Sequence, residues 1–161
     1  MKNVLMVCMG NICRSPMAQA VARKLASDAK LSQHLKFDSA GTHAHYVSER
    51  PDPRAVATLS RRGYDVGRTR SRRITQADFQ NFDMILAMDM NNLAELRRVC
   101  PAEHLQKLKL FLEFCGESEV AVGAEVPDPY YGNPEGFEKV LDLCEAGAKG
   151  LVGRLKASTK E

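Results

Sequence analysis

An apolar segment at residues 2–7 runs directly into the sequence Cys8-Met9-Gly10-Asn11-Ile12-Cys13-Arg14-Ser15-Pro16. The apolar run predicts a buried strand, and Ser15 followed by Pro16 is typical of the N-cap and first residue of a helix. A loop between a strand and a helix can turn its backbone N–H groups inward, next to the positive end of the helix dipole. This segment therefore predicts an α/β chain with an anion-binding loop directly after its first strand.

Two side chains extend the chemistry of this loop beyond anion binding. The field at a helix N-terminus favours the thiolate form of Cys8, which is the nucleophilic form. The planar guanidinium of Arg14 can hold two phosphoryl oxygens at once. The alternative is that Cys8 is an ordinary buried cysteine at a strand end. The preceding strand, the Asn-containing turn and the following helix start together favour a phosphate site with Cys8 as its nucleophile.

Size and composition predict one domain, which we expect to span residues 1–161. With 44% hydrophobic and 27% charged residues, the chain has the composition of a soluble globular protein. No N-terminal signal pattern is present, and no segment approaches the roughly 20 apolar residues of a membrane helix. The five cysteines are odd in number and lack paired zinc spacing. We therefore expect a cytoplasmic protein with no membrane partner.

Six arginines lie between residues 61 and 73, although the net charge is only +3. No interleaved aromatic residues or known nucleic-acid-binding motif accompany them. We expect a solvated face with modest electrostatic steering of acidic partners, and no nucleic-acid partner.

Apolar runs alternate with helical patterns along the rest of the chain. Strands are expected at residues 2–7, 35–40, 84–88 and 107–112, and helices are expected to begin at Pro16, Pro53, Asn92 and Pro134. This alternation predicts a single-domain, doubly wound four-stranded parallel sheet with helices on both faces. Such sheets bind ligands at the carboxyl ends of their strands, where Cys8 would lie.

Residues 113–133 form a long loop that contains Val126-Pro127-Asp128-Pro129-Tyr130-Tyr131-Gly132. The flanking prolines restrict the backbone of Asp128. On its own this segment is typical of a proline-rich turn with exposed tyrosines. A displaced phenolate needs a proton, however, so thiolate attack on an aryl phosphate requires a general acid nearby. Beside Cys8 and Arg14, Asp128 becomes the candidate acid, with Tyr130 and Tyr131 placed to flank an aryl group.

The chain resembles the low-molecular-weight protein-tyrosine phosphatase family, of bacterial type, over its whole length. The matching segments are Val7-Cys8 through Ser15-Pro16, Asp38-Ser39-Ala40-Gly41-Thr42, Pro51-Asp52-Pro53-Arg54, Ala87-Met88-Asp89, and Asp128-Pro129-Tyr130-Tyr131-Gly132. The resemblance implies the four-stranded doubly wound sheet and the hydrolysis of phosphotyrosine and small aryl phosphates. The acid follows the nucleophile far downstream, unlike the order in the larger tyrosine phosphatases.

The resemblance also implies the catalytic roles. Cys8 would form a cysteinyl-phosphate intermediate, and Arg14 would bind the phosphoryl oxygens and stabilise the transition state. Ser15 would donate its hydroxyl to the Cys8 sulfur. Asp128 would protonate the leaving phenolate and then, as a carboxylate, activate the hydrolytic water. No cofactor or metal is expected, because Arg14 and the loop N–H groups supply the positive charge.

Further positions follow from the same resemblance. Asn11 would hold the strained turn of the loop through a bond to Ser39, and Asp89 would support the loop. Cys13 could trap an oxidised Cys8 as a disulfide. Alternatively, Cys13 is a small buried side chain under the loop. The expected phosphate- and substrate-binding residues are Met9, Gly10, Asn11, Ile12, Cys13, Ser15, His45, Tyr130 and Tyr131.

Two positions depart from the family pattern. His45, followed by Tyr46, stands where a tryptophan commonly forms a wall of the pocket, so substrate stacking should be weaker or differently selective. Thr69 stands where a histidine often lies behind the loop, which leaves the support of Asn11 open.

Three other functions remain as alternatives. Arsenate reductases share the fold and the loop, but they need two further cysteines just after the third strand, and residues 81–99 contain none. Protein-arginine phosphatases tend to carry a threonine at the position of Ile12 and lack the tyrosine pair. A phosphate-binding module without activity would need neither Cys8 nor Asp128. The expected partners are phosphotyrosine proteins, in a bacterium an autophosphorylating tyrosine kinase, and we expect a monomer.

Overall fold

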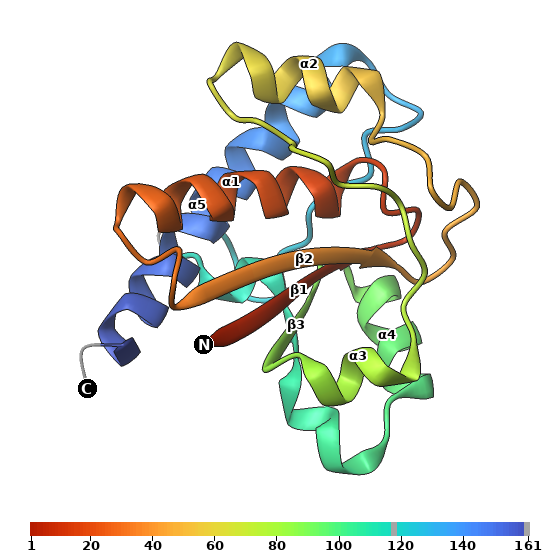
Figure 1. The fold of residues 1–161 in the computed structure, drawn as a ribbon. Coiled ribbons are helices and arrows are strands. Elements are labelled where there is room, and N and C mark those ends of the chain that lie inside the picture. Colours follow the sequence, from red (N-terminus) through yellow and green to blue (C-terminus); the bar gives the residue numbers. More distant parts are fainter. Residues whose placement is uncertain (117–118, 160–161) are drawn as a thin grey trace.

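The computed structural model describes residues 1–116 and 119–159. Four parallel strands form one sheet in the order β2-β1-β3-β4 (Figure 1). The strands are β1 (Lys2–Cys8), β2 (Leu35–Gly41), β3 (Met84–Ala87) and β4 (Leu108–Leu110). The predicted doubly wound, four-stranded parallel sheet is confirmed.

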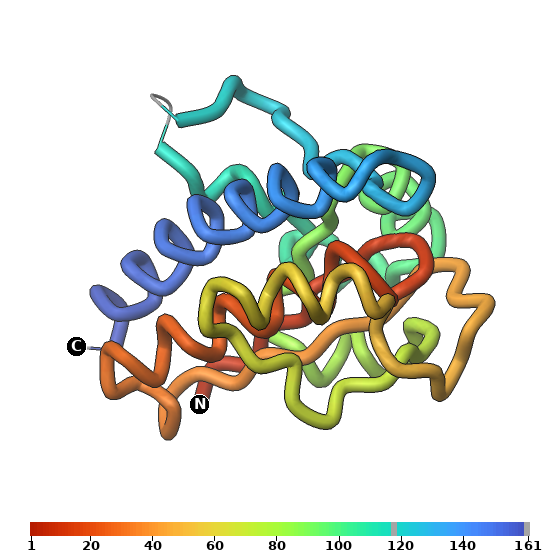
Figure 2. Tube along the Cα trace, turned by 90° about the horizontal axis from the view of Figure 1, so that it is seen from above, coloured from red at the N-terminus to blue at the C-terminus, as the bar shows by residue number. Residues whose placement is uncertain are grey.

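Helices cover both faces of this sheet. On one face lie α1 (Arg14–Asp28), α2 (Pro53–Arg61) and α5 (Pro134–Thr159), and on the other lie α3 (Gln76–Asn81) and α4 (Met90–Val99) (Figure 1). Seen from above, α5 runs alongside α1 and α2 (Figure 2). Within residues 1–116 and 119–159, no helix is both long enough and apolar enough to cross a bilayer.

Side chains of β1 point alternately into two hydrophobic cores. Val4 and Met6 belong to the core beneath α1 and α5, whereas Leu5 and Val7 belong to the core that contains Phe79 of α3. All four side chains are fully buried. A strand covered on both faces needs a continuous apolar run, which is why residues 2–7 were recognisable in the sequence.

The connections of the chain leave β1 at a topological switch point. The crossover through α1 places β2 on one side of β1, and the chain then returns to place β3 on the other side. In open α/β sheets, a crevice forms at the carboxyl end of the strand where the winding reverses. Residues 8–15, which we call the phosphate loop, begin at this end of β1.

Two element boundaries differ from the prediction because side chains there have other partners. Helix α1 begins at Arg14 rather than Pro16, and the Ser15 side chain lies inside the helix instead of capping it. Helix α4 begins at Met90 rather than Asn92, because Asp89 Oδ1 accepts a hydrogen bond from the Asn92 N–H at 2.7 Å and forms the cap. As a result, Arg14 is the first residue of α1 and Asp89 is the N-cap of α4.

The fourth strand is also shorter than the predicted 107–112. Only Leu108–Leu110 pairs with β3, and 3₁₀ turns occupy Ala102–Lys107 and Phe111–Phe114. The second turn buries Phe111 and Phe114, so the apolar residues that extended the predicted strand pack from a turn.

The predicted solvated face at residues 61–73 is wrong for two of its arginines. Arg62 forms ion pairs with Glu138, Asp142 and Glu145, all on α5. Arg72 pairs with Asp38 at 3.2 Å and with Asp78 at 3.0 Å. These arginines fasten the segment to the rest of the molecule.

Candidate active site

The Cys8 sulfur lies at the end of β1 and receives hydrogen bonds from two directions. Ser15 Oγ lies 3.0 Å from Cys8 Sγ, and the Asn11 backbone N–H donates to the same sulfur at 3.3 Å. Asn11 Nδ2 donates to Ser15 Oγ at 2.8 Å, so the hydroxyl proton of Ser15 is left to point at the sulfur. Donors that converge on sulfur stabilise the thiolate.

Asn11 sits at the turn of the phosphate loop with φ +56°. Asparagine tolerates this left-handed conformation better than most residues do. Its side-chain oxygen accepts a hydrogen bond from the Arg72 backbone N–H at 2.9 Å. The predicted bond to Ser39 is wrong, because the Ser39 hydroxyl pairs with the Gln19 side chain of α1 at 2.5 Å. Asn11 is therefore held from residue 72 instead of from β2.

The rest of the phosphate loop presents its backbone to a pocket. Gly10, Ile12, Cys13 and Arg14 line this pocket together with Cys8 and Met9. Among the residues that the structure describes, no protein acceptor takes the N–H groups of Gly10, Ile12, Cys13 and Arg14. Unused N–H groups at the start of α1 are suited to the oxygens of a phosphate.

Arg14, the first residue of α1, is anchored along one edge of its guanidinium. Its Nη1 donates to Asp89 Oδ2 at 2.5 Å and to the Val126 carbonyl at 3.1 Å. Burial acts to lower the pKa of Arg14, but the Cys8 thiolate and the Asp89 carboxylate outweigh burial and raise this pKa above its ordinary value. Asp89, which was predicted to support the loop, forms a direct ion pair with Arg14.

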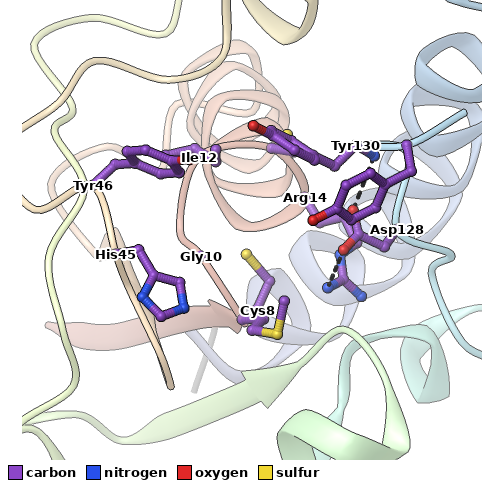
Figure 3. Close-up of a pocket in the computed structure, with 11 residues that line it drawn as sticks. Cys8, Gly10, Ile12, Arg14, His45, Tyr46, Asp128 and Tyr130 are labelled. Atoms are coloured by element: carbon purple, nitrogen blue, oxygen red, sulfur yellow. Dashed lines mark hydrogen bonds and ion pairs between the residues drawn. The ribbon is translucent and has the colours of Figure 1, made fainter.

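Asp128 reaches the same pocket from the loop before α5. Its Oδ2 lies 3.7 Å from Arg14 Nη2, and its Oδ1 accepts a hydrogen bond from the Tyr130 N–H at 3.0 Å (Figure 3). The side chain is 36% exposed, so the carboxyl group can exchange protons with solvent. The structure therefore brings Cys8, Arg14 and Asp128 together in one cavity, although Asp128 follows Cys8 by 120 positions in the sequence.

Aromatic side chains form opposite walls of the pocket. His45 and Tyr46 lie on one side, and Tyr130 lies with Asp128 on the other (Figure 3). The Tyr130 and Tyr131 rings meet edge to face with centroids 4.9 Å apart. The neighbouring Tyr46 hydroxyl raises the pKa of Tyr130. Tyr46 was not among the predicted binding residues, although its aromatic side chain beside His45 was a usable signal.

A set of contacts that joins α2 to the loop of Asp128 was also not predicted. Asp52 caps α2, and its carboxylate accepts hydrogen bonds from the backbone N–H and the guanidinium of Arg54. Arg54 Nη1 donates to the Tyr130 carbonyl at 3.1 Å, and the guanidinium lies 5.3 Å from the centre of the Tyr130 ring. The Asp52 N–H donates to the Ile12 carbonyl at 2.8 Å. Residues 51–54 were singled out in the sequence without a role, and here they join the phosphate loop to the loop of Asp128.

Cys13 lies beneath the phosphate loop and lines the pocket. Its side chain is buried, and burial together with the nearby Asp52 raises the pKa of its thiol. All five cysteines are free. The disulfide between Cys8 and Cys13 stays a prediction.

Support behind the loop comes from residues next to Thr69. Ser71 Oγ donates to the Gly10 carbonyl at 3.0 Å, and Arg72 holds Asn11 as described above. No sequence motif indicates these two contacts, because they depend on how residues 69–72 pass behind the loop.

Comparisons with known proteins agree with this geometry. A family model described as low molecular weight phosphotyrosine protein phosphatase matches residues 3–161. A low molecular weight protein-tyrosine-phosphatase of Streptomyces coelicolor is 41% identical over 155 residues, which are 95% of this chain and 93% of that protein. The human low molecular weight phosphotyrosine protein phosphatase is 40% identical over 143 residues, 89% of each chain. A crystal structure of a protein tyrosine phosphatase from Entamoeba histolytica, with Hepes in the active site, superposes with a TM-score of 0.92 at 38% identity over 99% of each chain.

Proposed function

This chain belongs to the low molecular weight phosphotyrosine protein phosphatase family, and we propose that it hydrolyses phosphotyrosine through a cysteinyl-phosphate intermediate on Cys8. The observation that carries this mechanism is the meeting of Cys8, Arg14 and Asp128 in one pocket. A nucleophile, a fixed cation and a proton donor are the three groups that transfer of a phosphoryl group from a phenol requires.

In the first step, the Cys8 thiolate attacks phosphorus, and the bond from phosphorus to the tyrosine oxygen breaks. Arg14 and the loop N–H groups bind the non-bridging oxygens, whose charge they stabilise in the transition state. Asp128, in its protonated form, gives its proton to the leaving phenolate oxygen. What supports this role is that Asp128 lines the same pocket as Cys8 and has a partly exposed side chain.

In the second step, a water molecule attacks phosphorus and the bond to Cys8 Sγ breaks. Asp128 is now a carboxylate, and it accepts the proton of this water. The Ser15 hydroxyl, 3.0 Å from Sγ, donates to the sulfur as its negative charge returns. The same hydrogen bond thus favours the thiolate before attack and its departure afterwards.

The walls of the pocket favour an aryl phosphate. Ile12, Tyr46 and Tyr130 line it, and such apolar and aromatic side chains can pack against a phenyl ring. Replacement of the common tryptophan by His45 leaves a smaller ring on that wall. We expect binding of the tyrosyl ring to depend mainly on the two tyrosines.

We further propose phosphotyrosine proteins as the substrates, in a bacterium an autophosphorylating tyrosine kinase among them. We place the reaction in the cytoplasm and expect the enzyme to act as a monomer. What supports the cytoplasmic location is the chemistry of the nucleophile, because a reducing compartment keeps a thiolate from forming disulfides.

The test is phosphate release from a phosphotyrosine peptide and from a phosphoarginine protein, measured in parallel with EDTA present. We expect release from phosphotyrosine alone, and none from the Cys8→Ser variant, which should still bind inorganic phosphate. Release mainly from phosphoarginine would overturn the substrate while leaving the nucleophile in place. Full activity of Cys8→Ser would overturn the mechanism.

A further inference from the structure

Residues 69–72, which we call the support segment, contact the phosphate loop and also residues 48–49, which follow the pocket-wall residues His45 and Tyr46. Ser71, at the centre of this segment, is only 2% exposed. Its backbone holds residues 48–49, just after the wall: the Ser48 N–H donates to the Ser71 carbonyl and the Ser71 N–H donates to the Glu49 carbonyl, each at 2.8 Å. Its hydroxyl contacts the phosphate loop instead, through the bond to the Gly10 carbonyl at 3.0 Å.

The carbonyl that Ser71 binds belongs to the same peptide group as the Asn11 N–H. A trans peptide group is planar, and its C=O and N–H point in opposite directions. Every peptide bond that the structure describes is trans. Fixing the Gly10 carbonyl therefore fixes the direction of the Asn11 N–H, which donates to Cys8 Sγ at 3.3 Å.

We propose that Ser71 is a positioning residue that aims the Asn11 N–H at the Cys8 sulfur and so favours the thiolate. The inference rests on the proposed role of Cys8 as the nucleophile. A backbone N–H bound to a charged acceptor contributes more than one bound to a neutral acceptor, so its alignment matters most when the sulfur is ionised.

The neighbouring residue acts on the same sulfur by a second route. The Arg72 N–H binds Asn11 Oδ1, and the amide of Asn11 in turn binds the Ser15 hydroxyl beside the sulfur. The support segment thus reaches both donors of Cys8. In the support segment, the first route uses the side chain of Ser71, whereas the second uses the backbone N–H of Arg72. A substitution of Ser71 can therefore remove the first contact without changing the backbone.

The decisive variant is Ser71→Ala, which deletes the hydroxyl and keeps both backbone bonds to the wall. Its matched control is Thr58→Val, because the Thr58 side chain is also 2% exposed and also donates to a backbone carbonyl, that of Arg54, at 2.8 Å. Ser71→Thr keeps the hydroxyl and serves as the conservative variant. Circular dichroism and thermal melting establish that each protein is folded.

The first measurement is the rate of Cys8 alkylation by iodoacetamide as a function of pH, read as the labelling that disappears in Cys8→Ser. We expect Ser71→Ala to move the midpoint upward by about half a pH unit, roughly a threefold change in the thiolate-to-thiol ratio. The second measurement is hydrolysis of a phosphotyrosine peptide. We expect kcat to fall by about threefold to tenfold with KM changed by less than about twofold, because the wall keeps its backbone bonds.

An unchanged midpoint in a folded Ser71→Ala protein would overturn the proposal. So would an equal shift in Thr58→Val, because the effect would then come from any lost buried hydroxyl. If Ser71→Ala does not fold, Ser71→Thr must retain both the wild-type midpoint and kcat, and a shifted midpoint there would refute the role. Alkylation reads the sulfur without turnover, so a failure of the proposed reaction in the phosphotyrosine assay is separate from a failure of this inference.

Discussion

At the scale of single residues, the site depends on which partner holds each side chain. Arg14 is fixed by Asp89 and Val126, which leaves its other edge toward Asp128. Asp128 Oδ1 accepts a hydrogen bond from the Tyr130 N–H of its own loop, and its Oδ2 lies 3.7 Å from the arginine. An arginine fixed in this way is suited to binding a phosphate, while a carboxyl group open to solvent is suited to moving a proton.

The first prediction follows from this division of roles. Asp128→Ala should lower kcat for phosphotyrosine by about a hundredfold or more, the usual contribution of a general acid. For p-nitrophenyl phosphate, whose leaving group needs little protonation, the loss should be several times smaller. The measurement is kcat for a series of aryl phosphates with leaving groups of increasing basicity. Asp65→Ala, which removes an exposed aspartate, is the control, and equal losses across the series would contradict the acid role.

At the scale of elements, the ends of helices place the functional groups. The start of α1 carries the phosphate loop and Arg14, and the cap of α4 is Asp89, which also binds Arg14. The cap of α2, Asp52, binds the phosphate loop through its N–H and Arg54 through its carboxylate. The start of α1 therefore lines the pocket with N–H groups that have no partner within the helix, and the caps of α2 and α4 hold residues that line it.

The second prediction concerns the Asp52 cap and its pH dependence. The hydrogen bond from Arg54 lowers the pKa of Asp52, although burial acts in the opposite direction. A lowered pKa in the folded state means that the ionised carboxylate adds stability above the unfolded value of about 3.9, and that this stability is lost as the pH falls through the folded value. Asp52→Ala should therefore lower the free energy of unfolding at pH 7 by about 1 kcal/mol.

Urea unfolding at pH 7 and at pH values below about 4 tests this prediction. The difference between wild type and Asp52→Ala should shrink at the lower pH. Asp52→Asn, which keeps a capping oxygen without the charge, should lose less at pH 7 and show less dependence on pH. A deficit in Asp52→Ala that stays constant across this range would mean that the charge on Asp52 contributes nothing.

At the scale of the whole molecule, the long helix α5 closes the chain over one face of the sheet. It packs along α1 and α2, and its start follows the loop of Asp128 (Figure 2). It also crosses the 3₁₀ turn Phe111–Phe114 at close range. The position of the acid therefore depends on packing between segments that are far apart in the sequence.

The separation of contacting residues along the chain explains which features could be predicted from the sequence. The phosphate loop was predictable because β1 needs a continuous apolar run and because its chemistry lies within eight residues. Asp128 was predictable because a leaving phenolate needs a proton donor near the nucleophile. The partners of Ser39 and Ser71 were not, since each is set by a helix or segment distant in the sequence. The ion pairs of Arg62 could not be predicted for the same reason, because its acidic partners lie on α5.

The third prediction tests the closure by α5 with two glycines of that helix. A Cβ at Gly150 would lie 1.8 Å from the Phe114 carbonyl oxygen, whereas a Cβ at Gly153 would meet nothing within 4 Å. Gly150→Ala should lower the free energy of unfolding by about 2–3 kcal/mol, because α5 must move away from the turn. Gly153→Ala should raise it by up to about 1 kcal/mol through helix propensity alone.

Urea unfolding of both variants, followed by circular dichroism and by phosphatase activity, gives the two free energies and shows whether the site is lost with the fold. Since α5 and the Asp128 loop are continuous, activity and helix content of Gly150→Ala should disappear at the same urea concentration, lower than for wild type. Equal stability of the two variants would mean that the contact with Phe114 is not a constraint on α5. Loss of activity well before loss of helix would instead show that the acid loop can detach while α5 stays packed.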